Sequence, residues 1–284
     1  MFSTGHLMWI AISIVFIICA LVLCLKKKPD IDRMLKVCFV IGVCSETVKV
    51  FSVARILPMV TPIIEKTADI QTINYTPTGQ FSPYLEMAHL PLELCSLQML
   101  FILVVLISKK NKWKRRFLAL INVTGSLGGI MGILFAYVTA DYHTVSEYFL
   151  SPRVWQFFLY HIMLVVLGLY IGFSGILEYS VRDFRDLLCA LFSMDFLTFY
   201  LNSIFSQPVY VNEKPVGLVY RANFFSSYVN PLGIVLTEKW QWILYLLIRM
   251  ILVLVLTYLL IFIQSFYVKH KYLPGKDIPE GKEK

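Results

Sequence analysis

The chain has 284 residues, of which 58% are hydrophobic and 15% are charged, and its formal net charge is +8. Its mean hydropathy of +0.70 excludes an ordinary soluble domain, because a chain of this length cannot bury so much apolar surface. The charge does not indicate a nucleic-acid partner, since the basic residues lie in short links between apolar segments. The composition predicts an all-α, multi-pass protein of the cell membrane, with one domain at residues 1–268 and a cytoplasmic tail at 269–284.

Seven apolar segments are each expected to cross a bilayer as a helix. The basic links after the first, third, fifth and seventh segments predict an N-terminus outside and a C-terminus in the cytoplasm. The first segment is preceded by no basic region and followed by no small-residue cleavage site, so it is expected to remain as an anchor. The predicted spans are residues 7–25, 34–57, 84–108, 117–139, 153–177, 187–206 and 240–265.

Two longer connections separate the spans. Residues 61–83 are rich in Pro, Thr and Asn and show no regular period, so they are predicted to form an irregular loop. Residues 207–239 contain many Tyr, Phe and Pro but no apolar run of span length, and a connection of this length is typical of a lid or binding loop. All six cysteines fall inside predicted spans, where their spacing indicates neither a disulfide framework nor a zinc site.

Glycines recur at a spacing of four in the fourth and fifth spans. Small residues at this spacing let helix backbones approach closely. The segment GSLGGIMG is not expected to be a phosphate-binding loop, which requires a preceding strand. The close-packing pairs are Gly125–Gly129, Gly128–Gly132 and Gly168–Gly172.

The third span is unusual because its first half is polar. Ionisable groups within a membrane are costly and usually mark function. In a continuous helix His89 and Glu93 share a face, so Glu93 is expected to orient the imidazole ring. Pro91 is expected to kink this helix. Cys95 lies about a third of a turn from His89, which makes a dyad of the two poor geometry in a straight helix.

Depth along the spans gives Cys95 another candidate partner. At about 1.5 Å per residue, His89 lies about 8 Å and Cys95 about 16 Å from the outer end of the third span, and His161 lies about 12 Å into the fifth. The thiol and both histidines are therefore expected in one outer layer, with His161 as the natural partner of Cys95. Asn202 is expected near this layer, and Gln98 is expected to line the same pocket.

Further charges are predicted inside the spans. Asp195 and Arg249 both fall near mid-membrane, where pairing relieves the free-energy cost of an isolated charge, so a structural ion pair is expected. Glu46 and Lys49 are three residues apart in the second span. They either satisfy each other or line the same cavity as Cys95.

The segment His89–Cys95, HLPLELC, resembles the H-x-P-L-x-L-C signature of the YwaF family of bacterial integral membrane proteins. The segment FFLYHIMLVVLGLYI around His161 looks like that family's second histidine, and Asn202 is a looser match. Eukaryotic relatives of the family include a multi-pass phospholipid acyltransferase with a membrane-embedded cysteine. The resemblance implies that Cys95 is the nucleophile and that His161 or His89 is the base.

The expected function is acyl transfer, in which a Cys95 thiolate attacks a lipid ester and forms a thioester. Membrane lipids are then the substrates, and no cofactor is required. The alternative is a transporter, channel or lipid-binding receptor lined by the intramembrane charges, although no repeated half of the chain supports a transporter. A metal site at His89, Glu93 and His161 is disfavoured, because no helical His pair with the usual spacing is present.

Overall fold

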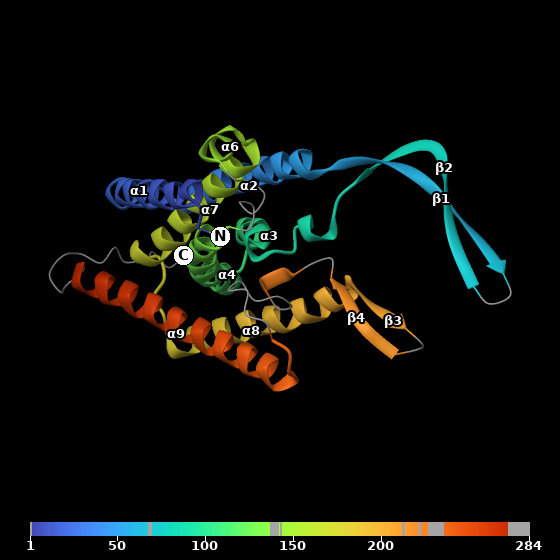
Figure 1. Ribbon diagram of the computed structural model, residues 1–284. Helices are drawn as coiled ribbons and strands as arrows, with labels where there is room; N and C mark the ends of the chain where they lie inside the picture. Colours follow the sequence, from blue (N-terminus) through green and yellow to red (C-terminus); the bar gives the residue numbers. More distant parts are fainter. Residues whose placement is uncertain are drawn as a thin grey trace.

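The computed structural model of the protein describes residues 2–67, 70–136, 142, 144–211, 214–220, 223–226 and 236–271. Its centre is α7 (Pro152–Phe173), which packs against α1 (Thr4–Lys27) and α2 (Ile31–Val53). The remaining long elements are α3 (Leu94–Ile107), α4 (Asn111–Val123), the π-helix η2 (Thr124–Gly128), α5 (Gly129–Leu134), α8 (Val181–Ile204) and α9 (Lys239–Lys271). Helix α4 contacts both α7 and α8, and α9 runs along the outside of the bundle (Figure 1). The short helix α6 (Val145–Leu150) precedes α7.

Local sequence signals explain several helix ends. Helix α1 follows Ser3, whose hydroxyl accepts a hydrogen bond from the backbone of His6, and it ends at Lys28, which has a left-handed backbone conformation. Helix α7 has Pro152 at its first position, where no backbone N–H is needed. Helix α8 begins with a capping box of Ser180 and Asp183, which starts it earlier than the apolar pattern alone predicts.

Five helices are long and apolar enough to cross a membrane: α1, the continuous run Asn111–Leu134, α7, α8 and α9. Helix α2 has 23 residues but is less apolar, because it carries Asp32, Arg33, Lys36, Glu46 and Lys49. Helix α3 has only 14 residues, a rise of about 21 Å at 1.5 Å per residue. The chain is therefore a multi-pass membrane protein with five candidate spans, and the seven-span count and the orientation of the termini stay predictions.

The third predicted span, residues 84–108, is wrong in its first half. Only a single 3-10 turn, η1 (Met87–His89), precedes the helix, and α3 begins at Leu94. Pro91 explains the break, because it lacks an N–H and disfavours the helical conformation in the residue before it. Leu90 accordingly has an extended backbone with φ −59° and ψ 148°. Since His89 and Glu93 do not lie on one helix, the predicted shared face is also wrong.

The all-α prediction is incomplete, because two antiparallel hairpins interrupt the helices. Strands β1 (Arg55–Thr67) and β2 (Ile70–Tyr84) form the first hairpin, which extends away from the bundle (Figure 1). Strands β3 (Ser206–Val211) and β4 (Lys214–Tyr220) form the second. Ile, Val, Thr and Tyr favour strands, and the prolines of the first hairpin are tolerated because a two-stranded sheet has only edge strands. The irregular loop predicted at residues 61–83 is therefore wrong.

The glycine pairs lie at helix contacts, as predicted. A Cβ atom on Gly125 would lie 2.9 Å from the carbonyl oxygen of Leu164, and one on Gly168 would lie 2.8 Å from the carbonyl oxygen of Asn122. The backbones of η2 and α7 can approach this closely only because both positions lack a side chain. The π-helix inserts an extra residue at the same contact.

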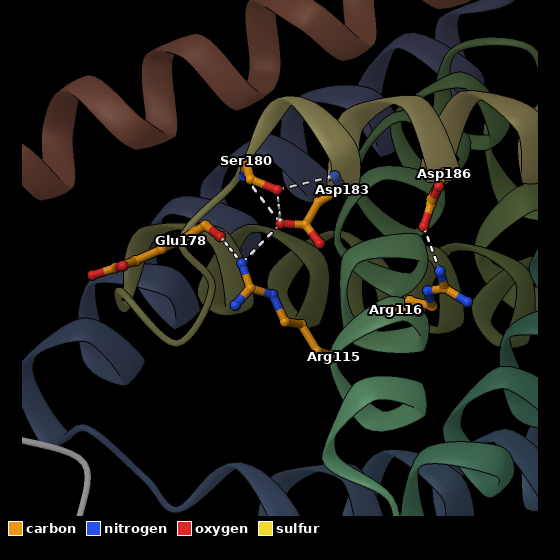
Figure 2. Close-up of polar contacts among 6 residues, drawn as sticks. All are labelled: Arg115, Arg116, Glu178, Ser180, Asp183 and Asp186. Atoms are coloured by element: carbon orange, nitrogen blue, oxygen red, sulfur yellow. Dashed lines mark hydrogen bonds and ion pairs between the residues drawn. The ribbon is translucent and has the colours of Figure 1, made fainter.

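Charged links tie the helices together at one end of the bundle, which we call the charged end. Arg115 donates to a carboxylate oxygen of Asp183 over 2.8 Å and also to the carbonyl of Glu178, whereas Arg116 pairs with Asp186 at 2.5 Å (Figure 2). The links after α3 and α7 thus meet at one end. A further pair, Lys114 with Asp32 at 2.9 Å, adds the link after α1.

Candidate functional site

Cys95 is the second residue of α3, directly after the break at Pro91. Glu93 is the N-cap residue of this helix but makes no side-chain cap hydrogen bond. The first N–H groups of a helix have no partner within the helix and favour negative charge, including that of a thiolate. The Cys95 sulfur also interacts with the backbone N–H and the hydroxyl of Ser96. Cys95 therefore lies at a helix start, a position that a continuous helix from residue 84 would not have provided.

Polar groups of α2 and α7 meet the start of α3. The Tyr160 hydroxyl donates to the carbonyl of Cys95 over 2.8 Å, and Gln156 donates to Ser45 over 2.5 Å. Ser96 donates to the carboxylate of Glu46, which also pairs with the buried Lys49. We call these groups, with Arg153, the Cys95 cluster: Ser45, Glu46, Lys49, Cys95, Ser96, Arg153, Gln156 and Tyr160.

Arg153 is a member of this cluster that the sequence analysis missed. It shares one face of α7 with Gln156 and Tyr160, at spacings of three and seven residues, and it hydrogen-bonds Gln156. Its guanidinium interacts electrostatically with Cys95 and Glu46. Among the described residues, no carboxylate forms an ion pair with it. The sequence did carry a signal for Arg153: it lies in the first turn of α7, directly after Pro152, and on the same face as two other polar residues.

The two predicted histidines lie in different surroundings. Nδ1 of His161 is 2.7 Å from the carbonyl oxygen of Phe157 within α7, and the ring packs on Gly132 of α5, where a Cβ atom would lie 2.4 Å from ring carbon Cδ2. His89 lies half-buried in η1 and interacts electrostatically with Arg153 and Lys49. Within the described part of the chain, no hydrogen bond joins Cys95 to either ring, so the identity of the base stays a prediction.

Glu93, Asn202 and Arg249 converge on a short turn in the connection between α8 and α9. This turn is η4 (Phe224–Ser226), and we call it the Phe224 turn. Asn202 accepts from the Phe224 N–H over 2.8 Å and donates to the Phe224 carbonyl over 3.0 Å. The Glu93 carboxylate accepts from the N–H of Phe225. Glu93 is therefore a partner of this turn and not, as expected, of His89.

The predicted Asp195–Arg249 ion pair is confirmed, with an N–O distance of 2.5 Å. Arg249 also donates to the Phe225 carbonyl over 2.8 Å. Phe225 has a left-handed backbone (φ 55°), which is uncommon for a bulky residue, and Phe224 is fully buried. The ion pair thus holds a strained turn next to Glu93, which directly precedes the Cys95 helix.

A model of the TMEM164 family matches residues 1–262, which include every residue of the Cys95 cluster and of the Phe224 turn. The chain belongs to the TMEM164 family. No curated protein and no solved structure matches it. The likeness of HLPLELC to the YwaF family therefore stays a resemblance of one motif.

Three further buried amide side chains in this TMEM164-family chain pack helices together. Gln98 donates to the Thr124 hydroxyl over 2.7 Å, so it faces η2 and is not, on the described contacts, part of the Cys95 cluster. The sequence analysis missed Asn122 and Gln264, which exchange two hydrogen bonds of 2.8 and 3.0 Å between α4 and α9. Lone amides inside apolar segments were the signal for this pair.

The sequence disfavours a metal site at His89, Glu93 and His161. Over the described residues, no group of three His, Cys, Asp or Glu side chains is arranged to hold a metal ion.

Proposed function

We propose that this TMEM164-family protein is an acyl-transfer enzyme that acts on phospholipids or other lipid esters through a thioester at Cys95. The observation that carries the proposal is the position of Cys95 at the uncapped start of a helix, within a buried polar cluster of an otherwise apolar chain. Arg153 supports the thiolate with a positive charge, and the N–H groups at the start of α3 suit the oxyanion of a tetrahedral intermediate.

The proposed reaction has two balanced steps. His161 or His89 accepts the thiol proton, the Cys95 sulfur bonds to the ester carbonyl carbon, and the carbon–oxygen bond of the ester breaks. The alcohol leaves as a lysolipid, taking the proton from the imidazole. The hydroxyl of a second lysolipid, another acceptor or water then gives its proton to the imidazole and its oxygen bonds to the thioester carbonyl carbon. The carbon–sulfur bond breaks, and the Cys95 sulfur takes the proton back from the imidazole, which restores the free thiol.

We further propose that α2 and α3 complete a single domain of seven spans at residues 1–268 in the plasma membrane, with the N-terminus outside. The pairing of three alternate links at the charged end supports this arrangement, because helices that traverse the membrane in turn bring alternate links to one side. On this topology the Cys95 cluster lies toward the outer leaflet.

The test is intact-protein mass spectrometry of the full chain after incubation with phospholipid and an acid quench. We expect an adduct with the mass of a fatty acyl chain that hydroxylamine removes. It should be absent from Cys95→Ala and retained in the matched control Cys189→Ala, which alters an exposed cysteine of α8. If the wild type carries no adduct and a thiol-reactive lipid analogue does not label Cys95, the transporter or lipid-binding function replaces the enzyme.

A further inference from the structure

A groove of about 330 Å³ runs between α2 and α3 beside the Cys95 cluster. Four of its six lining residues are apolar, and Glu46 and Thr47 are the other two. Thr47 is already satisfied within α2, because its hydroxyl donates to the Val43 carbonyl. The lining residues are Val43, Glu46, Thr47, Val50, Phe51 and Met99.

The groove opens on the outer surface of the bundle. Phe51 at its rim is 82% exposed and Val43 is 46% exposed. On a membrane-embedded protein, an apolar surface of this kind faces the hydrocarbon of the lipids. From Val43 to Phe51 the groove follows about 12 Å of α2, at 1.5 Å per residue. The groove is shallow and open along its length, so a chain can enter it from the side.

The middle of the groove adjoins the residue that follows the proposed nucleophile. Glu46 lies in its wall and accepts a hydrogen bond from Ser96, the residue after Cys95. Met99 follows Cys95 by one helical turn and lies against Gly42, so the part of the groove at Val43 and Met99 begins about one turn of α3 beyond the thiol. Polar atoms that can bind an ester thus lie directly beside an apolar wall that can bind its acyl chain.

We infer that this groove holds the fatty acyl chain of the donor lipid, which reaches Cys95 sideways from the bilayer between α2 and α3. The inference rests on the proposed function and assigns the site of the chain. The ester end lies at Ser96 and Cys95, and the chain lies against Val43 and Met99, on the side of the groove that leads away from the outer end of α2. Met99 suits an apolar chain because a thioether is flexible and polarisable.

Gly42 sets the position of Met99. A Cβ atom on Gly42 would lie 2.8 Å from Cγ of Met99, so the missing side chain leaves the space in which Met99 is seated. A larger residue at position 99 has no such space behind it and must project into the groove. The bulk at position 99 therefore determines how far an acyl chain extends.

The test compares Met99→Trp with Leu100→Trp, a matched control on the next residue of α3, whose side chain is 54% exposed and does not line the groove. Each full-length protein is incubated with phospholipids of different chain lengths, and the masses of the Cys95 adducts are measured by mass spectrometry. We expect Met99→Trp to lose long-chain adducts at least tenfold relative to short-chain ones, and Leu100→Trp to keep the wild-type distribution. An unchanged distribution in Met99→Trp would overturn the inference.

A second measurement does not depend on catalysis or on the folding of the tryptophan variant. Cys95→Ala in lipid nanodiscs is photolysed with a phosphatidylcholine that carries a diazirine in its acyl chain, and crosslinked peptides are mapped. We expect crosslinks concentrated on residues 43–51 and Met99 rather than on the exposed face of α9. Labelling no stronger there than on α9 contradicts the inference. If labelling is concentrated there but the wild type forms no adduct, the acyl-chain site stands and the proposed reaction fails.

Discussion

The two ends of the bundle handle charge in different ways. At the charged end, Arg115 and Arg116 pair with Asp183 and Asp186 as simple, partly exposed ion pairs. At the other end, three polar side chains form hydrogen bonds with the backbone of the Phe224 turn: Glu93, Asn202 and Arg249. Cys95 there is the second residue of a helix whose first N–H groups lack a side-chain cap. The first arrangement joins helices, and the second holds an irregular backbone beside Cys95.

The difference shows where the free energy of this structure is concentrated. Exposed ion pairs each contribute little, whereas buried polar groups that lose a partner are strongly destabilising. Variants at the Phe224 turn and variants at the charged end should therefore differ severalfold in their effect on stability. Thermal unfolding of the purified full-length protein in detergent measures each effect.

The largest effect is expected from breaking the Asp195–Arg249 pair. Asp195→Ala leaves a half-buried guanidinium without its carboxylate and weakens the support of the Phe225 carbonyl. We expect a loss of about 3 kcal/mol in unfolding free energy, the lower end of the range for buried pairs, because the two side chains are 17% and 23% exposed. The double variant Asp195→Leu with Arg249→Met removes both charges and should recover part of this loss. Equal losses in the single and double variants would show that the charge pair itself contributes nothing.

A smaller effect is expected at Asn202. Asn202→Ala removes the two hydrogen bonds that join α8 to the backbone of the buried Phe224. A buried hydrogen bond that is lost costs about 1–3 kcal/mol, and we expect a total loss of about 2–3 kcal/mol because the turn can relax. Asn202→Asp keeps the acceptor for the N–H but places a carboxylate oxygen against the Phe224 carbonyl, so it should lose more than Asn202→Ala. The prediction fails if the two variants unfold at the same temperature.

The helix contact between the two ends should respond to a single methyl group. Gly125→Ala places its Cβ atom 2.9 Å from the backbone oxygen of Leu164, which cannot turn away. We expect a loss of about 1–2 kcal/mol from overpacking. In Gly128→Ala the new Cβ atom would lie 3.0 Å from Cδ2 of Leu94, a flexible side chain that can move away. The midpoint of unfolding of Gly128→Ala should therefore stay closer to that of the wild type than the midpoint of Gly125→Ala.

The smallest effect is expected at the charged end. Arg116→Ala removes the ion pair between Arg116 and Asp186. The side chain of Arg116 is 33% exposed and that of Asp186 is 24% exposed. Surface pairs contribute about 0.2–1 kcal/mol, and we expect a loss in that range that shrinks in high salt. A loss as large as that of Asp195→Ala would remove the distinction between the two ends.

The sequence predicted those features that depend on one helix or on one strong energetic rule. The apolar runs located α1, α7, α8 and α9 to within several residues, and the free-energy cost of a lone intramembrane charge predicted the Asp195–Arg249 pair. The four-residue glycine spacing likewise predicted the contact of η2 with α7.

The remaining features depend on contacts between distant segments. Pro91 was expected to kink a helix, but the extended backbone at Leu90 ends it, and no local pattern distinguishes the two outcomes. The partner of Glu93 is more than 130 residues away in the chain, in a connection whose pattern shows no period. The position of the Cys95 thiol at a helix start was therefore beyond the reach of the sequence, although Cys95 itself was predicted as the nucleophile.

The pairing at the charged end also bears on how the protein is inserted into its membrane. Asp183 and Asp186 begin α8, whereas Arg115 and Arg116 lie in the first turns of α4, so the two groups meet only if both helices start from the same side. A nascent chain with α8 reversed would carry both carboxylates to the opposite face and leave the arginines without them. The ion pairs that contribute least to the stability of the fold thus record that α4 and α8 start at the same end of the bundle.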